Sequence, residues 1–388
     1  MRWRRYLLKV EQQLENSQLR FSSILLLFLL WLAIQLSTFH YLGIRTGSDT
    51  QLYVDAAHDF LNGEWPQGRL IWYTTYIVFL AMVFALGGSL PLVVFLQMLL
   101  SGIAAVALWF SVKRMTDSFW TSFVAVLLYL CWFKIHQWNI FIYTESLFTS
   151  LAIITFAILL NLKRPYHYIL FTILFLLTFF VRPTGFCFLI GVMLYGMQKV
   201  PLNFSMKLVF GAILLLACFF LLNNMLSQFT LVESYAKGEV IYPNIRLGVE
   251  VPNDLMIPDT SLSPLARLGM FVFYNPFYFI KITLLKLFLF LANVKPYFSW
   301  LHNLLITLVL YPLYIFAFLG FKHFHEKRCG KYFILGFILV QSLTVMLTTE
   351  NWDGRFLIPT LPFIFILSAM GMQWISRRVR YIWKGNSQ

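Results

Sequence analysis

The sequence predicts an all-α membrane protein, a polytopic bundle of about ten transmembrane helices with further helices at its outer face. The composition is the first reason: the chain of 388 residues is 60% hydrophobic and only 12% charged, whereas soluble domains carry about 25% charged residues. The second reason is the recurrence, from Phe21 onward, of apolar runs able to cross a hydrocarbon core of about 30 Å. Backbone polar groups in lipid must be satisfied within each segment, so we expect these runs to be helices.

The expected spans follow one another as a single transmembrane domain over 1–388. They are 21–43, 90–112, 119–133, 146–162, 166–181, 184–198, 207–224, 302–321, 331–349 and 356–376. The net charge of +14 is dispersed through the short connecting loops, a pattern that orients spans in a membrane. We therefore expect membrane lipids as partners and no nucleic acid.

Two further apolar stretches, 69–86 and 270–293, decide the topology. Basic residues flank the first and last spans, so both ends of the chain are expected in the cytoplasm and the number of crossings is even. If neither stretch crosses, most basic residues of the short middle loops, such as Lys113, are cytoplasmic; if both cross, they lie outside. The sequence therefore favours interfacial positions for both stretches, within two long outer loops at 44–89 and 225–301.

The first outer loop predicts a short amphipathic helix over 47–63 that lies on the membrane surface. Ser48 and Gln51 have the spacing of a capping box, and Gly63 is a favourable C-terminal stop. Asp49 stands where this helix begins. Local sequence alone explains Asp49 as an acid that complements the helix dipole.

An Asp directly after the first span, followed by Tyr53 and small residues on a surface helix, resembles the GT-C superfamily of polytopic glycosyltransferases. These enzymes use polyprenyl-phosphate-linked sugars and include the protein O-mannosyltransferases and the bacterial aminoarabinose transferases of lipid A. The resemblance implies a glycosyltransferase in which Asp49 is the catalytic base. The Asp49 carboxylate would accept the proton of an attacking acceptor hydroxyl, with inversion at the sugar. Tyr53 is a candidate donor contact.

Three later motifs extend the resemblance. Thr144-Glu145-Ser146 opens a span on the predicted outer side and resembles the family's second acidic site. Arg182, in an Arg-Pro-Thr-Gly turn, and Arg355, in an Arg-Phe-x-x-Pro-x-x-Pro signature, also resemble family motifs and are expected to bind the donor phosphate. Without the resemblance, Glu145 is explained as a helix N-terminal acid and each arginine as an interfacial anchor.

Arg69 and Lys295 complete the expected phosphate-binding set, and His302, beyond the second outer loop, is a further candidate donor contact. The local alternatives are a snorkelling lysine and a histidine satisfied by its neighbours. A divalent metal ion held by Glu145 is a candidate cofactor. The sequence offers no compact ligand cluster for it, so metal dependence stays open.

The acceptor stays open between a glycan, a lipid and a protein. Thr50 follows Asp49 where protein O-mannosyltransferases carry an Asp-Glu pair, which argues against a protein acceptor in particular. The resemblance implies a bacterial cytoplasmic membrane with the site facing the periplasm. An endoplasmic reticulum protein with a lumenal site is the alternative.

Three other functions compete with the transferase. An O-antigen-type polymerase or ligase would rely on arginine-rich outer loops, and outer arginines are sparse here. A lipid-linked glycan transporter or flippase would place polar residues at mid-membrane, so the positions of Gln97, Asn161 and Gln341 test that hypothesis. A structural subunit would leave the acids and arginines of the outer face unexplained.

Overall fold

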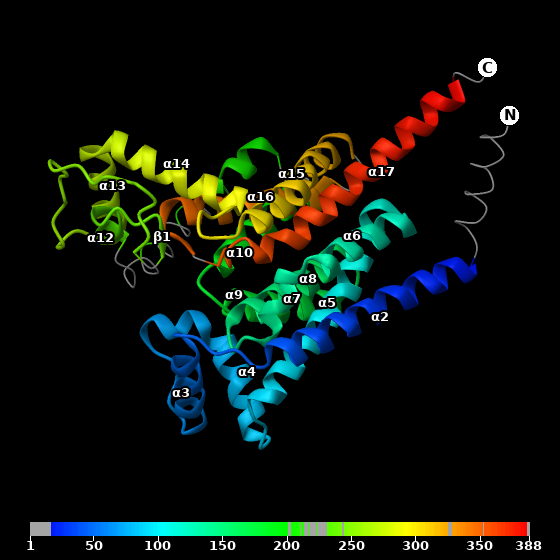
Figure 1. Cartoon of the computed structure of the whole chain (residues 1–388), viewed down its shortest axis with the longest axis horizontal. Coiled ribbons are helices and arrows are strands. Elements are labelled where there is room, and N and C mark those ends of the chain that lie inside the picture. The colour runs from blue at the N-terminus through cyan, green and yellow to red at the C-terminus, as the bar shows by residue number, and fades with distance from the viewer. Residues whose placement is uncertain are drawn as a thin grey trace.

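The computed structural model describes residues 17–200, 203–209, 211–212, 216, 223, 231–242, 244–324, 328–351 and 353–385. The basic stretch before Ser17 and most of the expected span at 207–224 lie outside these residues. The described part is an all-α bundle, as predicted, and its long helices run side by side (Figure 1). The start of α2 (Ser17–Leu42) and the end of α17 (Leu361–Gly385) lie at one end of the bundle, and α3 (Thr50–Leu61) lies at the other.

The remaining helical elements fill the bundle and a small lobe at its side. In chain order they are η1 (Gly68–Tyr73), α4 (Thr74–Ala85), α5 (Leu90–Thr116), α6 (Phe119–Cys131), α7 (Phe133–Gln137), η2 (Trp138–Ile140), α8 (Thr144–Leu160), α9 (Pro165–Phe179), α10 (Gly185–Lys199), α12 (Leu231–Ala236), α13 (Pro264–Tyr274), α14 (Pro276–Ala292), α15 (Trp300–His323), α16 (Arg328–Leu347) and η3 (Ile358–Thr360). The strands β1 (Ile241–Tyr242) and β2 (Glu350–Asn351) pair in parallel. This pairing joins the lobe formed by α12, α13 and α14 to the segment that follows α16.

Six described helices are long and apolar enough to cross a membrane, or up to eight if each of two bent helix pairs is one span. The six are Ser17–Leu42, Gly68–Ala85, Leu90–Thr116, Trp300–His323, Cys329–Leu347 and Ile358–Val379. They support an integral membrane protein. Three expected spans form the shorter apolar helices α8, α9 and α10, and a helix of fifteen residues rises only about 22 Å. The expected ten crossings and the cytoplasmic ends therefore stay predictions.

The two stretches that decide the topology differ in shape. Gly68–Ala85 has the length and hydropathy of a span. The stretch at 270–293 falls on α13 and α14, which are bent by 111° at Asn275, the geometry of a broken span or a re-entrant loop. A second bend, of 58°, separates α6 from α7 and η2 at Trp132. The second bend ends the expected span at 119–133 and turns the chain toward the start of α8.

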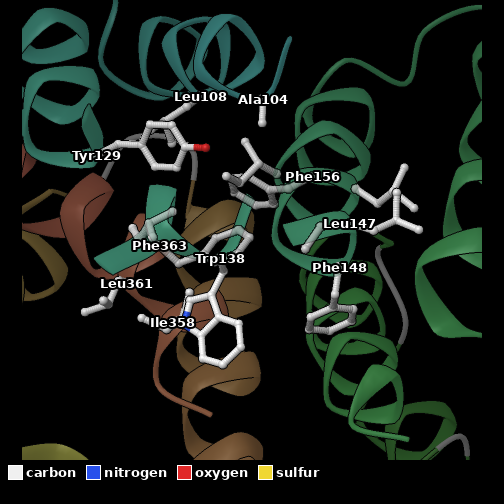
Figure 2. Close-up of a cluster of buried hydrophobic side chains, with 14 of the residues drawn as sticks. Ala104, Leu108, Tyr129, Trp138, Leu147, Phe148, Phe156, Ile358, Leu361 and Phe363 are labelled. Atoms are coloured by element: carbon white, nitrogen blue, oxygen red, sulfur yellow. The ribbon is translucent and has the colours of Figure 1, made fainter. Parts of the chain in front are cut away.

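The core of the bundle is built around α8, nearly all of whose residues are buried. Phe156 stacks on Phe333 with ring centroids 4.6 Å apart and meets Phe363 edge-on at 5.4 Å. Figure 2 shows side chains from α5, α6, α8, η3 and α17 gathered in this cluster. Leu147 and Phe148 belong to it and follow Glu145 within one helical turn. The core therefore fixes the end of α8 at which Glu145 lies.

Close backbone contact fixes α17 against α15. A Cβ at Gly320 would overlap the Leu367 carbonyl, and a Cβ at Gly371 would overlap the Phe316 carbonyl. Apolar side chains gain little when they move from lipid into a helix–helix contact, because lipid tails are equally apolar. Small residues that let helix backbones approach closely are therefore a common means of packing helices in lipid. The packing holds the start of α17, which follows directly on the Arg355 segment.

The first outer loop forms the predicted short helix, α3, with a different start, and its position on a membrane surface stays a prediction. The buried face comprises Thr50, Tyr53, Ala56 and Ala57. The expected capping box is wrong: Asp49 is the N-cap residue without a side-chain capping bond, and Gln51 Nε2 donates to Asp55 Oδ1 at 2.7 Å. The reason is that the backbone before α3 is held by contacts with another segment. Gly63 follows the helix with φ of +94°, the predicted C-terminal stop.

Candidate functional site

The loop that carries Asp49 is tied to the segment that enters α8. The Arg45 N–H donates to the Ile140 carbonyl at 2.9 Å, and the Arg45 carbonyl accepts from the Ile142 N–H at 3.0 Å. The Asp49 N–H donates to the Tyr143 hydroxyl at 3.2 Å. These hydrogen bonds hold two segments that are far apart in the sequence side by side. Asp49 is thereby placed at the start of α8.

Gly47 allows the Asp49 loop to approach Tyr143 closely. A Cβ at position 47 would overlap the Tyr143 hydroxyl and ring. The Gly47 N–H donates to the Thr50 hydroxyl oxygen at 2.9 Å, and this hydroxyl donates to the Ile142 carbonyl at 3.2 Å. The contacts on both sides of Asp49 fix its backbone, so its carboxylate occupies a restricted volume.

Asp49 belongs to a chain of ion pairs with three other predicted site residues. Arg355 Nη1 lies 3.8 Å from Asp49 Oδ2, and Arg355 Nε lies 3.5 Å from Glu145 Oε1. Arg182 Nη1 donates to the same Glu145 oxygen at 3.2 Å. We call Asp49, Glu145, Arg182 and Arg355 the charged cluster. Its two carboxylates and two guanidiniums sum to no net formal charge.

The charged cluster is buried on one side and open on the other. The Glu145 side chain is 1% exposed and that of Arg182 is 6% exposed, against 21% for Arg355 and 35% for Asp49. Burial opposes the charge on Arg355, but Glu145 and Asp49 outweigh it and keep the pKa of this guanidinium above its usual value. Glu145 Oε2 and Arg355 Nε have no hydrogen-bond partner within the described part of the chain. Unmet buried polar atoms of this kind can be satisfied by a water molecule or a ligand.

Aromatic rings surround the open side of the cluster. The Arg355 guanidinium lies 5.7 Å from the centroid of the Tyr143 ring and 5.5 Å from that of Phe356, within cation–π range. Tyr53 meets Tyr73 at 5.3 Å and Tyr143 at 6.3 Å between ring centroids. Burial, with the neighbouring Tyr73 and Asp49, raises the pKa of Tyr53 well above its usual value. The Tyr53 hydroxyl therefore stays protonated and can donate a hydrogen bond.

Two further ion pairs fix the segment that leads to Arg355. Lys134 Nζ of α7 lies 2.6 Å from Asp353 Oδ1. Lys295 Nζ lies 3.7 Å from Glu350 Oε1, and both side chains are at most 1% exposed. Burial raises the pKa of Glu350 to about 7 although Lys295 opposes the shift, and burial likewise lowers the pKa of Lys295 against the attraction of Glu350. Lys134 of α7 and Lys295 of the loop after α14 therefore fix the segment just before Arg355.

The structure brings most of the predicted site residues together. Those that meet are Asp49, Tyr53, Glu145, Arg182 and Arg355. Lys295 is instead paired with Glu350, and Arg69 is exposed at the start of η1. His302 stands at the start of α15, where its ring lies 4.5 Å from that of Phe298. The expected donor contacts of Lys295, Arg69 and His302 stay predictions.

Sequence reasoning missed four residues that build the site. Glu350 and Asp353 lie within five residues before Arg355, and Lys134 follows the apolar run at 119–133. Tyr143 precedes the Glu145 motif directly. The sequence does mark Glu350 and Asp353 as candidates, because charged groups at the ends of apolar runs are costly and are usually functional. Their partners could not be read from spacing.

The described residues contain no group of three or more His, Cys, Asp or Glu side chains that could hold a metal ion. Asp49 and Glu145 are the carboxylates of the charged cluster, and both face arginines. Hard divalent cations need several oxygen ligands. One or two carboxylates hold Mg²⁺ only together with water or substrate oxygens, so the divalent ion expected at Glu145 stays a prediction.

No protein-family model matches this chain, and no curated protein or solved structure matches it either.

Proposed function

We propose that the chain is an inverting glycosyltransferase that moves a sugar from a polyprenyl-phosphate donor to an acceptor at the outer face of a bacterial cytoplasmic membrane. The observation that carries the proposal is the charged cluster. Side chains from four distant segments, expected from the sequence as base, second acidic site and phosphate site, form a chain of ion pairs in which each member lies within 3.8 Å of the next. Independent anchors at helix ends have no reason to converge. A site that must accept a proton and stabilise a leaving phosphate does.

The contacts of α4 support one common outer face. The Thr75 N–H at its start donates to the Phe180 carbonyl at 3.0 Å, just before Arg182. At the other end of α4, Phe84 and Gly87 border the same open space as Gly47, two residues before Asp49. Both ends of α4 thus belong to the side of the bundle that holds the charged cluster. This favours an interfacial hairpin for 69–86 over a crossing.

Asp49 is suited to act as the base. Its carboxylate is the most exposed member of the charged cluster, while its backbone is held by Tyr143. In the proposed reaction the oxygen of an acceptor hydroxyl attacks the anomeric carbon and its proton passes to the Asp49 carboxylate. The new C–O bond forms as the bond to the phosphate oxygen breaks, so the configuration inverts. Asp49 then releases the proton to water.

Arg355 is suited to receive the leaving phosphate. Its distances of 3.5 and 3.8 Å to the two carboxylates are longer than hydrogen bonds, and its Nε–H has no acceptor among the described residues. Phosphate oxygens can therefore take these donors without breaking a hydrogen bond of the protein. The electron pair of the broken C–O bond goes to the phosphate, which gains one negative charge. Arg355, with Arg182 behind it, compensates that charge.

A transporter or flippase fits the polar side chains less well. Gln97 Nε2 donates to two backbone carbonyls in the segment before α8, and Asn161 is the C-terminal cap of that helix. Gln341 Nε2 donates to the carbonyl of Phe356, next to Arg355. Asn161 lies at a helix end, Gln341 bonds beside Arg355, and both Gln97 donors are taken by backbone carbonyls, whereas a transport pathway needs polar groups that face it at mid-membrane.

Donor consumption tests the proposal. The purified protein in liposomes is incubated with a panel of radiolabelled polyprenyl-phosphate sugars, beside Asp49→Asn and the control Asp59→Asn, an exposed acid on the same helix. We expect the wild type and Asp59→Asn to release sugar from one donor, and Asp49→Asn to be slower by about 10² to 10⁴. Full activity of Asp49→Asn would refute its role as base. Consumption of no donor, combined with joining or movement of a lipid-linked glycan, would favour the polymerase or the transporter.

A further inference from the structure

A hollow lies beside the Asp49 loop, on the side of α3 that faces α4 and α5. Its volume is about 600 Å³, within the range of ligand pockets. Gln51, Val54 and His58 of α3 line one side, and Phe84 and Ser89 line the other. The hollow therefore lies between α3 and the turn that joins α4 to α5, on the side of the bundle that holds the charged cluster.

The Asp49 loop borders both the hollow and the charged cluster. Gly47 and Thr50, on either side of Asp49, line the hollow. The same loop contacts Tyr143, whose ring lies under Arg355. A group bound in the hollow therefore lies against the loop that carries Asp49, and Arg355 faces the Asp49 carboxylate from the charged cluster.

The hydroxyl and amide side chains of the hollow carry no charge, and His58 is the ionisable side chain among the described residues that line it. Of the described residues that line it, none is Asp, Glu, Lys or Arg. Hydroxyls come from Thr46 and Ser89, and the Ser89 side chain makes no capping bond to α5. The Gln51 amide N–H₂ donates to Asp55, which leaves the Gln51 carbonyl oxygen for another partner. The lining has no Lys or Arg to pair with a phosphate and no Asp or Glu to pair with a basic peptide, so it favours hydroxyl groups without charge.

An aromatic pair closes one side of the hollow. The His58 and Phe84 rings are stacked at 5.0 Å with an angle of 7° between their planes. Flat rings beside a few hydrogen-bonding groups form the usual lining of a small-molecule pocket. A sugar ring, with one apolar face and a rim of hydroxyls, has the matching chemistry.

We propose that the hollow binds the acceptor and that the acceptor is an uncharged sugar, of either a free glycan or a glycolipid. This inference rests on the proposed function, and it selects the glycan among the acceptors that the sequence left open. The acceptor hydroxyl enters from the hollow, gives its proton to Asp49 and forms the new C–O bond as the donor phosphate leaves on the side of Arg355.

The test uses the full-length protein in liposomes with the donor that it consumes. Four acceptors are compared: a neutral oligosaccharide, a neutral glycolipid, a lipid with a phosphorylated headgroup, and a basic peptide with Ser and Thr. Ser89→Trp fills the hollow and Gln51→Leu removes a polar group without adding bulk. Ser261→Trp, at an exposed turn of the α12–α14 lobe, is the matched control. Hydrolysis of the donor by water is measured in parallel, because it reports on the charged cluster without an acceptor.

We expect transfer to one of the two neutral acceptors. Ser89→Trp and Gln51→Leu should raise the KM for that acceptor by at least about tenfold, as expected for lost pocket contacts, and should leave donor hydrolysis unchanged. The control Ser261→Trp should change neither the KM nor donor hydrolysis. Comparing the free and the lipid-linked sugar identifies its source. Preference for the phosphorylated lipid or the peptide, transfer to neither neutral acceptor, or unchanged KM in both variants overturns the proposal. Absence of any donor consumption by the wild type would overturn the transferase itself.

Discussion

The ion pair between Lys134 and Asp353 gives the sharpest test of how Arg355 is positioned. It joins α7 to the segment just before Arg355, with 2.6 Å between Nζ and Oδ1 and side chains only 25% and 10% exposed. Two unit charges at this separation attract by about 6 kcal/mol at an effective dielectric constant of about 20. Desolvation and side-chain entropy offset much of this, so we expect a coupling energy of about 1–3 kcal/mol.

The perturbation is a double-mutant cycle with Lys134→Met and Asp353→Asn, extended by the reversed pair Lys134→Asp with Asp353→Lys. Loss of the ion pair lets the segment before Arg355 shift, and a misplacement of about 1 Å can lower a rate by about 10²-fold. Each single variant should therefore slow donor consumption by about 10- to 100-fold. The reversed pair should recover most of the rate, because it restores the link with the opposite polarity.

Single-turnover donor consumption and thermal unfolding are measured on the same samples. Arg267→Met is the control, since it breaks the 2.5 Å pair with Glu233 in the α12–α14 lobe and should change stability without changing the rate. Additive effects of the two single variants, with a coupling below about 0.3 kcal/mol, would refute the reasoning. So would a reversed pair that regains stability and stays inactive.

Three further substitutions test the segment around Arg355. Arg355→Lys should slow single-turnover transfer by about 10² to 10³ because a point charge replaces a forked donor. A rate within about threefold of the wild-type rate would contradict the role of Arg355 in binding phosphate. Burial raises the pKa of Glu350 to about 7, so between pH 5 and 7 the folded protein keeps a proton that the unfolded chain releases. Wild-type stability should therefore fall across this window relative to Glu350→Gln, and parallel stability curves would contradict the shift. Gly354→Ala should lower the unfolding temperature more than Gly63→Ala, because both have positive φ but only the methyl at 354 meets a neighbouring side chain; equal losses would show that backbone strain alone matters.

The members of the charged cluster could be chosen from the sequence on two grounds. A charge at the end of an apolar run is costly to keep near lipid, which singles out Glu145, whereas the family resemblance singles out Arg182 and Arg355. Asp49 stood out only through its place after the first span and the family resemblance. What the sequence could not provide was their distance from one another, which depends on how the segments before α3 and α8 bond to each other.

The parts that sequence reasoning missed lack a periodic signal. β1 and β2 are two residues long, too short for an alternating pattern, and they pair across more than a hundred positions of the chain. The buried partnership of Lys295 with Glu350 follows from that pairing and from the end of α14. The capping box failed for a related reason: Tyr143, which is remote in sequence, holds the backbone at Asp49 and leaves Gln51 to bond Asp55. Tertiary contacts overrode a local pattern in both places.

The donor phosphate is expected at Arg355 and the acceptor hydroxyl at Asp49, and the ion pair between these two residues implies an order of binding. In the structure Arg355 faces both Asp49 and Glu145, so the base is partly neutralised before the donor arrives. A donor phosphate draws Arg355 toward its own oxygens, which leaves the Asp49 carboxylate free to accept a hydrogen bond from the acceptor hydroxyl. The donor should therefore bind before the acceptor becomes reactive. Product-inhibition kinetics check this: polyprenyl phosphate should compete with the donor and not with the acceptor, and competition with both would show that binding of the donor does not prepare the base.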